Sequence, residues 1–317
     1  MVPVLVALAL WAFAWPSARL APHDLPLGVA GPATATAQVE RQLAAREGAF
    51  EIHRYADESA ARDAVEDRTV YGAVVVTARG PELLTASAAS PLVAQLLQQA
   101  MAEQAPKGTE LTTVDVVPTP ATDPRGAALG AGVLPMALAG MAAGVVVTLL
   151  GLHGGRAAVT LLAAAALVGL VAAAILDSWL GVLSGGWWAE AGVLGLSALA
   201  VSAAVTGLSA LLGRAGIGIG IGALLVILLG NPFSGATSAP QMLPEPAGAI
   251  GQWLPPGAGA SLLRSVSFFD GAAATGPALT LTWWAALGLG AVVLSSILKR
   301  ERPATEPAAE REPALAG

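Results

Sequence analysis

Two patterns of hydrophobic and polar residues divide the chain. Residues 126–298 consist of long apolar runs with few ionisable side chains, whereas residues 21–125 alternate short apolar and polar stretches. A helix needs about 20 mostly apolar residues to cross a bilayer. Runs that meet or approach this length lie at 126–152, 157–183, 191–212, 215–230 and 276–298. They predict a membrane domain, residues 126–298, of about five helices.

The beginning of the chain, residues 1–20, is also apolar, but it is near the short end for a span. Two interpretations are open, a cleaved signal peptide or an uncleaved first transmembrane helix. A signal peptide carries positive charge before its apolar run, and this segment has none there. The transmembrane helix is therefore favoured. The whole pattern predicts a polytopic α-helical membrane protein with about six transmembrane helices.

Residues 21–125 carry the pattern of an α/β domain between the first and second helices. Strands are predicted at 27–31, 50–55, 70–77, 82–87 and 109–117, and helices at 34–46, 57–67 and 90–104. The stretch 70–77 is the most apolar, so it is expected at the centre of the sheet. A mixed sheet with helices packed against it follows. Residues 118–125 contain three prolines and predict a linker to the membrane domain.

Charges beside the predicted spans indicate an orientation, because short cytoplasmic loops are enriched in Lys and Arg. The basic residues fall on one side of the spans: Arg156, Arg214, Lys299, Arg300 and Arg302. The acidic residues fall on the other side: Asp177, Glu190, Glu245 and Asp270. Tryptophans that fit an outer aromatic belt are Trp179, Trp187, Trp188, Trp253, Trp283 and Trp284. Both termini are therefore expected inside, and the α/β domain outside, in a multi-pass protein of a bacterial cytoplasmic membrane.

Residues 231–275 form a Gly/Pro-rich connection on the predicted outer side. It is too apolar for a free loop and too interrupted by proline for a span. We therefore expect a short re-entrant or interfacial segment at 248–254 and an amphipathic turn at 261–269. Two interpretations are open, an outer gate or substrate vestibule and a packed outer cap. Under the first, the functionally sensitive positions are Asn231, Pro232, Arg264 and Asp270. The polar end of the chain, residues 299–317, predicts a disordered cytoplasmic tail.

Composition and motifs narrow the chemistry. Hydrophobic residues make up 55% and charged residues 12% of the chain, against about a quarter charged in a soluble domain. The absence of cysteine excludes disulfides and thiolate chemistry, and the net charge of −6 argues against nucleic acid as a partner. The sequence lacks a P-loop, and its three histidines are scattered without metal-ligand spacing. We predict no catalytic, cofactor-binding or metal-binding residue, and hence no enzyme.

The charged residues outside and near the spans do not indicate a binding site or an ion path. The acidic stretch 57–67, with Arg62 and Arg68 interleaved, is expected to be a solvated helix face. Ionisable residues inside a membrane commonly mark ion or proton paths. Asp177 and Glu190 are expected near the outer interface within reach of water, so the sequence disfavours an ion- or proton-coupled transporter.

Small residues are frequent in the spans, including the run of glycines and isoleucines at 216–222. Glycine and alanine allow helices to approach closely in a membrane. GC-rich codon usage would enrich the same residues, and the sequence does not separate the two explanations. For the 216–222 run, close helix packing is favoured over a dinucleotide-binding loop, because no strand precedes it.

Short segments across the chain carry a family resemblance. They are 24–32 (DLPLGVAGP), 67–76 (DRTVYGAVVV), 84–91 (LTASAASP), 115–135 (DVVPTPATDPRGAALGAGVLP), 230–235 (GNPFSG) and 253–271 (WLPPGAGASLLRSVSFFDG). In these motifs and in the order of its parts, the chain resembles the ABC-2-type transporter permease superfamily. Within it, the chain is most similar to membrane proteins related to the phage infection protein.

This resemblance implies the membrane half of an exporter that works as a homodimer with a separate ATP-binding subunit. The substrate expected from the uncharged spans is apolar or amphipathic. One feature departs from the family pattern, because the break between the second and third spans, at 153–156, is too short for a helix that docks an ATPase. An alternative therefore stays open, a surface-exposed binding or scaffold membrane protein that acts through its outer domain without ATPase coupling.

Overall fold

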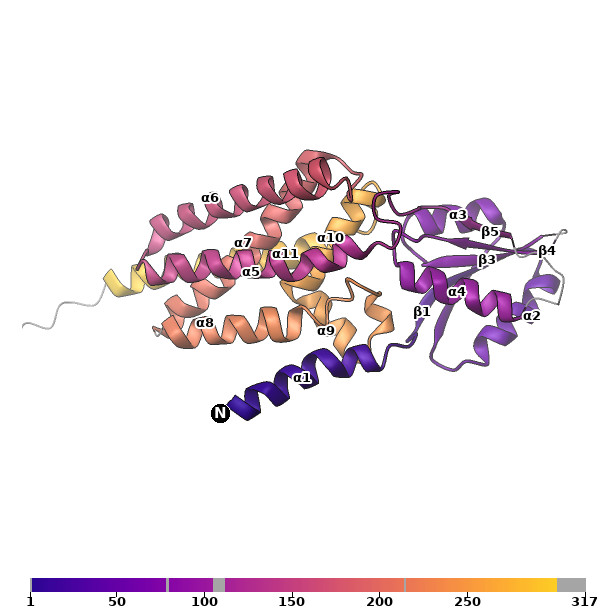
Figure 1. Ribbon diagram of the computed structural model, residues 1–317, viewed down its shortest axis with the longest axis horizontal. Coiled ribbons are helices and arrows are strands. Elements are labelled where there is room, and N and C mark those ends of the chain that lie inside the picture. The colour runs from indigo at the N-terminus through magenta and orange to yellow at the C-terminus, as the bar shows by residue number, and fades with distance from the viewer. Residues whose placement is uncertain (1, 78–79, 105–111, 214, 301–317) are drawn as a thin grey trace, which may run out of the picture.

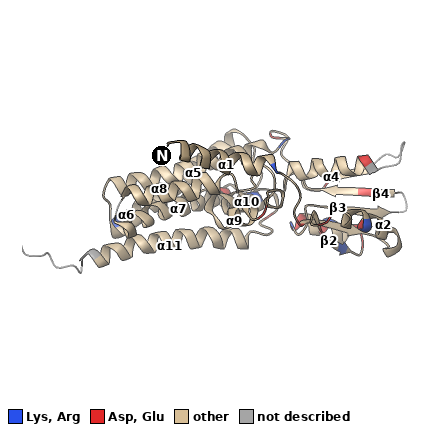
Figure 2. Cartoon of the chain, turned by 90° about the horizontal axis from the view of Figure 1, so that it is seen from below, with Lys and Arg blue, Asp and Glu red and all other residues tan. Residues whose placement is uncertain are grey.

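The computed structural model places a helical half and an α/β half end to end (Figure 1). It describes residues 2–77, 80–104, 112–213 and 215–300. The helices of the first half are α1 (Val2–Ala18), α5 (Ala127–Leu149), α6 (Gly154–Ala173), η1 (Ala174–Trp179), α7 (Trp187–Leu212), α8 (Ala215–Ala223), η2 (Leu224–Gly230), η3 (Pro240–Met242), α9 (Ala247–Trp253), α10 (Pro255–Phe268) and α11 (Thr275–Arg300). Charged residues gather over the α/β half and are sparse over the helical half (Figure 2).

Four helices in the described part of the chain are long and apolar enough to cross a membrane, which indicates a membrane protein. They are α5, α6 with its continuation η1, α7, and α11 as far as Leu298. The two other predicted spans are shorter apolar helices, α1 and the continuous pair α8 and η2. Trp11 and Trp15 of α1 stack on each other and meet Phe233, just after η2, edge to face. The two short helices are thus neighbours.

Helix α7 is the centre of the bundle, with 67% of its most apolar window buried. Neighbouring helices approach its backbone at glycines. A Cβ on Gly140 of α5 would lie 2.9 Å from the carbonyl oxygen of Ala198, and one on Gly288 of α11 would lie 2.5 Å from that of Ala203. On α8, a Cβ at Gly218 would come within 2.4 Å of the Ser209 backbone. Close packing therefore requires glycine at these positions, whatever the codon usage.

The α/β half is a five-stranded mixed sheet in the order β2-β1-β3-β4-β5. The strands are β1 (Leu25–Ala30), β2 (Phe50–Tyr55), β3 (Gly72–Thr77), β4 (Gly80–Thr85) and β5 (Thr112–Asp115). Only β3 and β4 pair antiparallel. The helices are α2 (Ala33–Ala44), α3 (Glu58–Glu66) and α4 (Pro91–Gln104). The most apolar strand, β3, is central as predicted, because both of its faces are covered.

Residues of the helical half complete the hydrophobic core on both faces of this sheet. On the face covered by α3, Phe269 is buried with Val65 and Val75. On the face covered by α2 and α4, Met242 is buried with Leu27. Backbone hydrogen bonds add to the second contact, since the amides of residues 21 and 23 donate to the carbonyls of residues 242 and 241. The two halves therefore share cores instead of meeting only through a linker.

In the connection 231–275 the predicted turn is part of a helix, while the predicted re-entrant or interfacial segment stays a prediction. Residues 248–254 lie largely in α9, and the predicted turn at 261–269 is the second half of α10, a helix buried along almost its whole length. Proline at the start of α10 explains its boundary, because proline lacks an amide hydrogen and its fixed φ suits the first helical turn. Of the predicted tail 299–317, Lys299 and Arg300 continue α11, and residues 301–317 lie outside the described residues.

Candidate functional site: a helix shared by an apolar cavity and the α/β half

A narrow apolar cavity lies inside the helical half. Its volume is about 40 Å³, measured as the space open to the centre of a water-sized sphere, which is room for a few waters or methylene groups. The lining includes Gly132, Val133 and Met136 of α5, Leu194, Ser197 and Val201 of α7, and Pro256, Gly259, Ala260 and Leu263 of α10. The hydroxyl of Ser197 is already used, because it donates to the carbonyl of Val193 at 2.8 Å. This lining suits an alkyl group and offers little to a polar one.

The side of α10 next to this cavity wall carries polar residues that meet the α/β half. Arg68 follows the C-cap of α3 and reaches α10, where its Nη1 donates to the carbonyl of Ser261 at 3.2 Å and to the hydroxyl of Ser265. Its guanidinium also lies over the ring of Phe269, 5.2 Å from the centroid. The backbone of Arg68 is strained, because its φ is +58°. This left-handed conformation is unfavourable for residues with a Cβ and is usually adopted by glycine.

Arg264 of α10 is a second guanidinium at this contact, with 4% of its surface exposed. Its Nη2 donates to the carbonyl of Ala236 at 2.8 Å. Burial and the nearby charge of Arg68 lower the pKa of Arg264 to about 10, and burial also lowers the pKa of Arg68. Both guanidiniums are therefore charged at neutral pH. Among the described residues, neither forms an ion pair with a carboxylate.

Tyr71 completes the contact between the halves. It lies just before β3, and its hydroxyl donates to Oε1 of Gln241 at 2.9 Å. Burial raises the pKa of this phenol, so Tyr71 is neutral at physiological pH and does not compensate the charges of Arg68 and Arg264. The polar contact is thus a positively charged, largely buried patch against the cavity-lining helix.

The four positions predicted from the sequence are only partly brought together. Arg264 lies in the contact just described. Asn231 and Pro232 are half-buried where η2 ends, and the carbonyl of Asn231 accepts from the hydroxyl of Ser234 at 2.7 Å. Asp270 is exposed in the turn after α10. Among the described residues, no hydrogen bond or ion pair links Asn231 or Asp270 to Arg264.

Arg68 corrects one prediction from the sequence. It was expected on a solvated helix face together with Arg62. Arg62 does pair with Glu58, at 3.2 Å, but Arg68 turns away and contacts α10. The helix ends before Arg68, and its left-handed backbone changes the direction of the side chain. Helical periodicity in the sequence could not reveal this.

The position of Glu190 also differs from the prediction. It was expected within reach of water, but it is fully buried, with 0% of its surface exposed, in the first turn of α7. Its Oε1 accepts from the amide of Gly185 at 2.9 Å, while its Oε2 has no hydrogen-bond partner. Ser267 of α10 also has an unpartnered buried hydroxyl. The segment before α7 is held against α10, because Ser184 donates to the carbonyl of Ser267 at 3.0 Å.

Comparisons with known proteins do not relate this chain to a family or to a known structure. Within the described residues, no three His, Cys, Asp or Glu side chains are placed to hold a metal ion together. No family model matches the sequence, and neither a curated protein nor a solved structure is significantly similar to it.

Proposed function

We propose that the chain is the membrane component of an ABC-2-type exporter for an apolar or amphipathic compound, energised by a separate ATP-binding subunit. The observation that carries this proposal is the double role of α10. One side of the helix lines the apolar cavity through Gly259, Ala260 and Leu263. The neighbouring side holds the α/β half through Ser261 and Ser265. Movement of the α/β half would therefore change the cavity wall directly.

The proposal includes six spans, with both termini in the cytoplasm and residues 21–125 outside. Two short apolar helices, α1 and the α8–η2 pair, would supply the spans beyond the four long ones. Arg156 at the start of α6 supports a cytoplasmic location for that end of the bundle. Large exposed tryptophans near the other end, Trp179, Trp188 and Trp253, suit an outer aromatic belt.

A homodimer is part of the proposal. Helix α6 supports it, because only 22% of its most apolar window is buried within the chain. Its side chains Leu162, Leu167 and Leu170 are exposed. Small residues interspersed along the same helix would let a second copy approach closely.

The experiment is purification of the tagged full-length chain in a mild detergent, followed by mass spectrometry and by efflux from cells. We expect a nucleotide-binding subunit in stoichiometric amount, and ATP-dependent efflux of an apolar dye that disappears when the chain is deleted. A Gly132→Leu variant would fill the cavity without a clash at Cβ, since no atom other than the neighbouring backbone of α5 lies within 4 Å of that position. It should abolish efflux while the subunit still co-purifies. Gly290→Leu, at an equally open site on α11, is the matched control.

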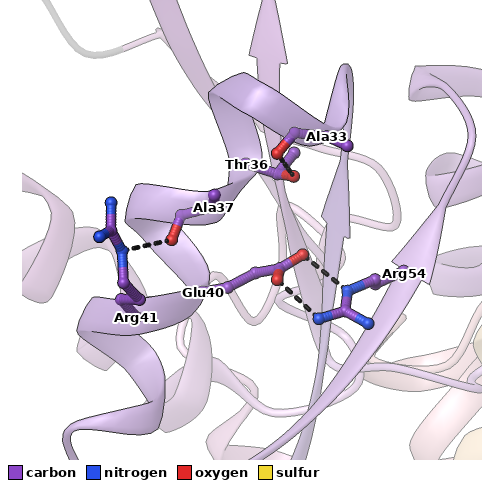
Figure 3. A network of polar contacts seen from close by, with 6 residues as sticks. All are labelled: Ala33, Thr36, Ala37, Glu40, Arg41 and Arg54. Atoms are coloured by element: carbon purple, nitrogen blue, oxygen red, sulfur yellow. Dashed lines mark hydrogen bonds and ion pairs between the residues drawn. The ribbon is translucent and has the colours of Figure 1, made fainter.

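A second candidate function is binding or scaffolding by the α/β half without an ATPase. An open groove on that half, between α2 and the edge strand β2, favours it, and Figure 3 shows the contact of Glu40 with Arg54 there. Glu40 accepts two hydrogen bonds from Arg54, at 2.8 and 2.7 Å, and the Arg54 side chain is 77% exposed. The short break between α5 and α6 also leaves little chain for docking an ATPase.

These two functions are separated by a variant in the groove. Glu40→Gln would remove the carboxylate that positions Arg54, and Arg41, which bonds to the helix backbone through Ala37, would stay in place. If the chain acts through this groove, Glu40→Gln should prevent recovery of a partner protein, and deletion of the chain should not change efflux. An exporter should show no change in efflux or in the recovered ATP-binding subunit.

A further inference from the structure

The buried charges beside α10 extend the proposed function by naming a substrate class. We propose that the chain binds an amphiphile with one alkyl chain and an anionic head group, phosphate or carboxylate. The alkyl chain would occupy the apolar cavity, and the head would lie against Arg264 and Arg68. This inference rests on the proposed export function, but its test measures binding alone.

The charge balance is the first argument. Arg264 is almost completely buried and Arg68 is half-buried, and their acceptors are neutral: the carbonyls of Ala236 and Ser261 and the hydroxyl of Ser265. A buried charge without an opposite charge is costly, so proteins normally pair it. No described carboxylate pairs with either one. An anion bound between them would supply the missing countercharge.

The arrangement along α10 is the second argument. Leu263 lines the cavity and Arg264 follows it directly, while Ala260, one turn earlier, lines the cavity on the same side as Arg264. Ala236, the acceptor of Arg264, packs in the same apolar cluster as Leu263 and Val133. Arg264 is therefore next to cavity-lining residues along α10, and its acceptor belongs to the same apolar cluster as part of that lining.

Chemistry and size define the ligand. Guanidinium groups form short, charge-assisted hydrogen bonds with phosphate and carboxylate oxygens, often two at a time. A neutral head group would leave both guanidiniums without a countercharge. The cavity of about 40 Å³ has room for a few methylene groups, so it would hold only part of one alkyl chain and not two chains side by side.

The test is equilibrium binding of radiolabelled dodecyl phosphate to the purified full-length chain in dodecyl maltoside. This detergent has the same alkyl chain and a neutral head, so it competes for the apolar part only. We expect saturable binding that excess unlabelled dodecyl phosphate displaces. Inorganic phosphate should not displace it at the same concentration. Equal competition by inorganic phosphate would overturn the proposal, because it would show an anion site without an alkyl site.

Variants locate the ligand. Arg264→Gln and Arg68→Gly should each weaken binding about tenfold or more, because each removes one charge-assisted hydrogen bond to the head group. Glycine suits the left-handed backbone at position 68, so Arg68→Gly keeps the test valid if Arg264→Gln does not fold. Gly132→Leu should weaken binding to a similar extent by filling the cavity, while Gly290→Leu should bind as the unmodified chain does.

Unchanged affinity in both Arg68→Gly and Gly132→Leu would refute the inference, because bound dodecyl phosphate would then lie elsewhere. Failure here is distinguishable from failure of the export proposal. If dodecyl phosphate does not bind, but an ATP-binding subunit is still recovered and efflux is still observed, the export proposal stands. Only the proposal of an anionic amphiphile as substrate is then rejected.

Discussion

Phe269 offers the sharpest test of the shared core. It follows α10 in the helical half, yet its ring is buried on the α3 face of the sheet with 5% of its surface exposed. The guanidinium of Arg68 lies over the same ring. If this contact holds the halves together, Phe269→Ala should loosen the sheet even though the substitution lies about 200 residues from β3 and outside the α/β segment.

The magnitude follows from the burial. Replacing a buried Phe with Ala costs about 3–5 kcal/mol, and the lost contact with Arg68 adds about 0.5–2 kcal/mol at a partly buried site. We take about 3 kcal/mol as the lower expectation for opening of the sheet. Each 1.4 kcal/mol corresponds to a factor of ten, so the protected amides of β1 and β3 should exchange about a hundredfold faster.

Hydrogen exchange measured by mass spectrometry on the full-length chain in detergent is the assay, because it reports local opening separately for each segment. Amides of α6, which packs against α7 and α11, serve as the internal reference. Trp253→Ala is the control variant. It also removes a large aromatic ring, but that residue is 76% exposed, so the exchange of β1 and β3 should not change.

Unaltered exchange of β1 and β3 in Phe269→Ala would refute the reasoning. It would mean that the sheet is stable without the helical half and that the two parts are joined only by the chain. Faster exchange in α6 by the same factor would refute it as well, since the effect would then be a general loss of folding.

Two further predictions concern the bundle and are measured by the midpoint of thermal unfolding in detergent. Gly288→Val should destabilise the protein by about 1–3 kcal/mol through overpacking, since its Cβ would meet the Ala203 backbone at 2.4 Å. Gly290→Val, at an open position, should have little effect. Equal losses of stability in the two variants would contradict the contact between α7 and α11. Glu190→Gln keeps an oxygen that can accept from the amide of Gly185 and should change the midpoint little, whereas Glu190→Ala should lower it by leaving that amide without its acceptor. A midpoint for Glu190→Gln as low as that for Glu190→Ala would contradict the importance of this acceptor.

Local physical rules account for what could be predicted. Crossing a bilayer requires a long run of consecutive apolar residues. Such a run is visible in the sequence, so the four long helices could be predicted from it. Short alternating apolar and polar stretches likewise predicted a mixed α/β half, and the apolar character of residues 70–77 predicted that β3 lies at its centre. Helix α1 and the continuous pair α8 and η2 fall near the length limit, and this is why a count of six remains a proposal.

The candidate site was predicted only in part, because its contacts join distant residues. Among the predicted positions, Arg264 lies at the contact, while Asn231 and Asp270 have other surroundings. Arg68 bonds to α10 across 193 and 197 positions of sequence, and no local pattern encodes such a pairing. Glycine frequency in the spans was also ambiguous until the structure showed which glycines meet a neighbouring backbone.

The sequence by itself determined that this is a membrane protein with an α/β part, because hydropathy and periodicity act within one segment at a time. Only the tertiary structure decided how the parts are coupled. It buried Glu190, placed Phe269 and Met242 in the cores of the sheet, and brought together two arginines that form no ion pair with a carboxylate among the described residues. The physical reason is that burial and charge pairing depend on which segments pack together, and that packing brings residues together from opposite ends of the chain.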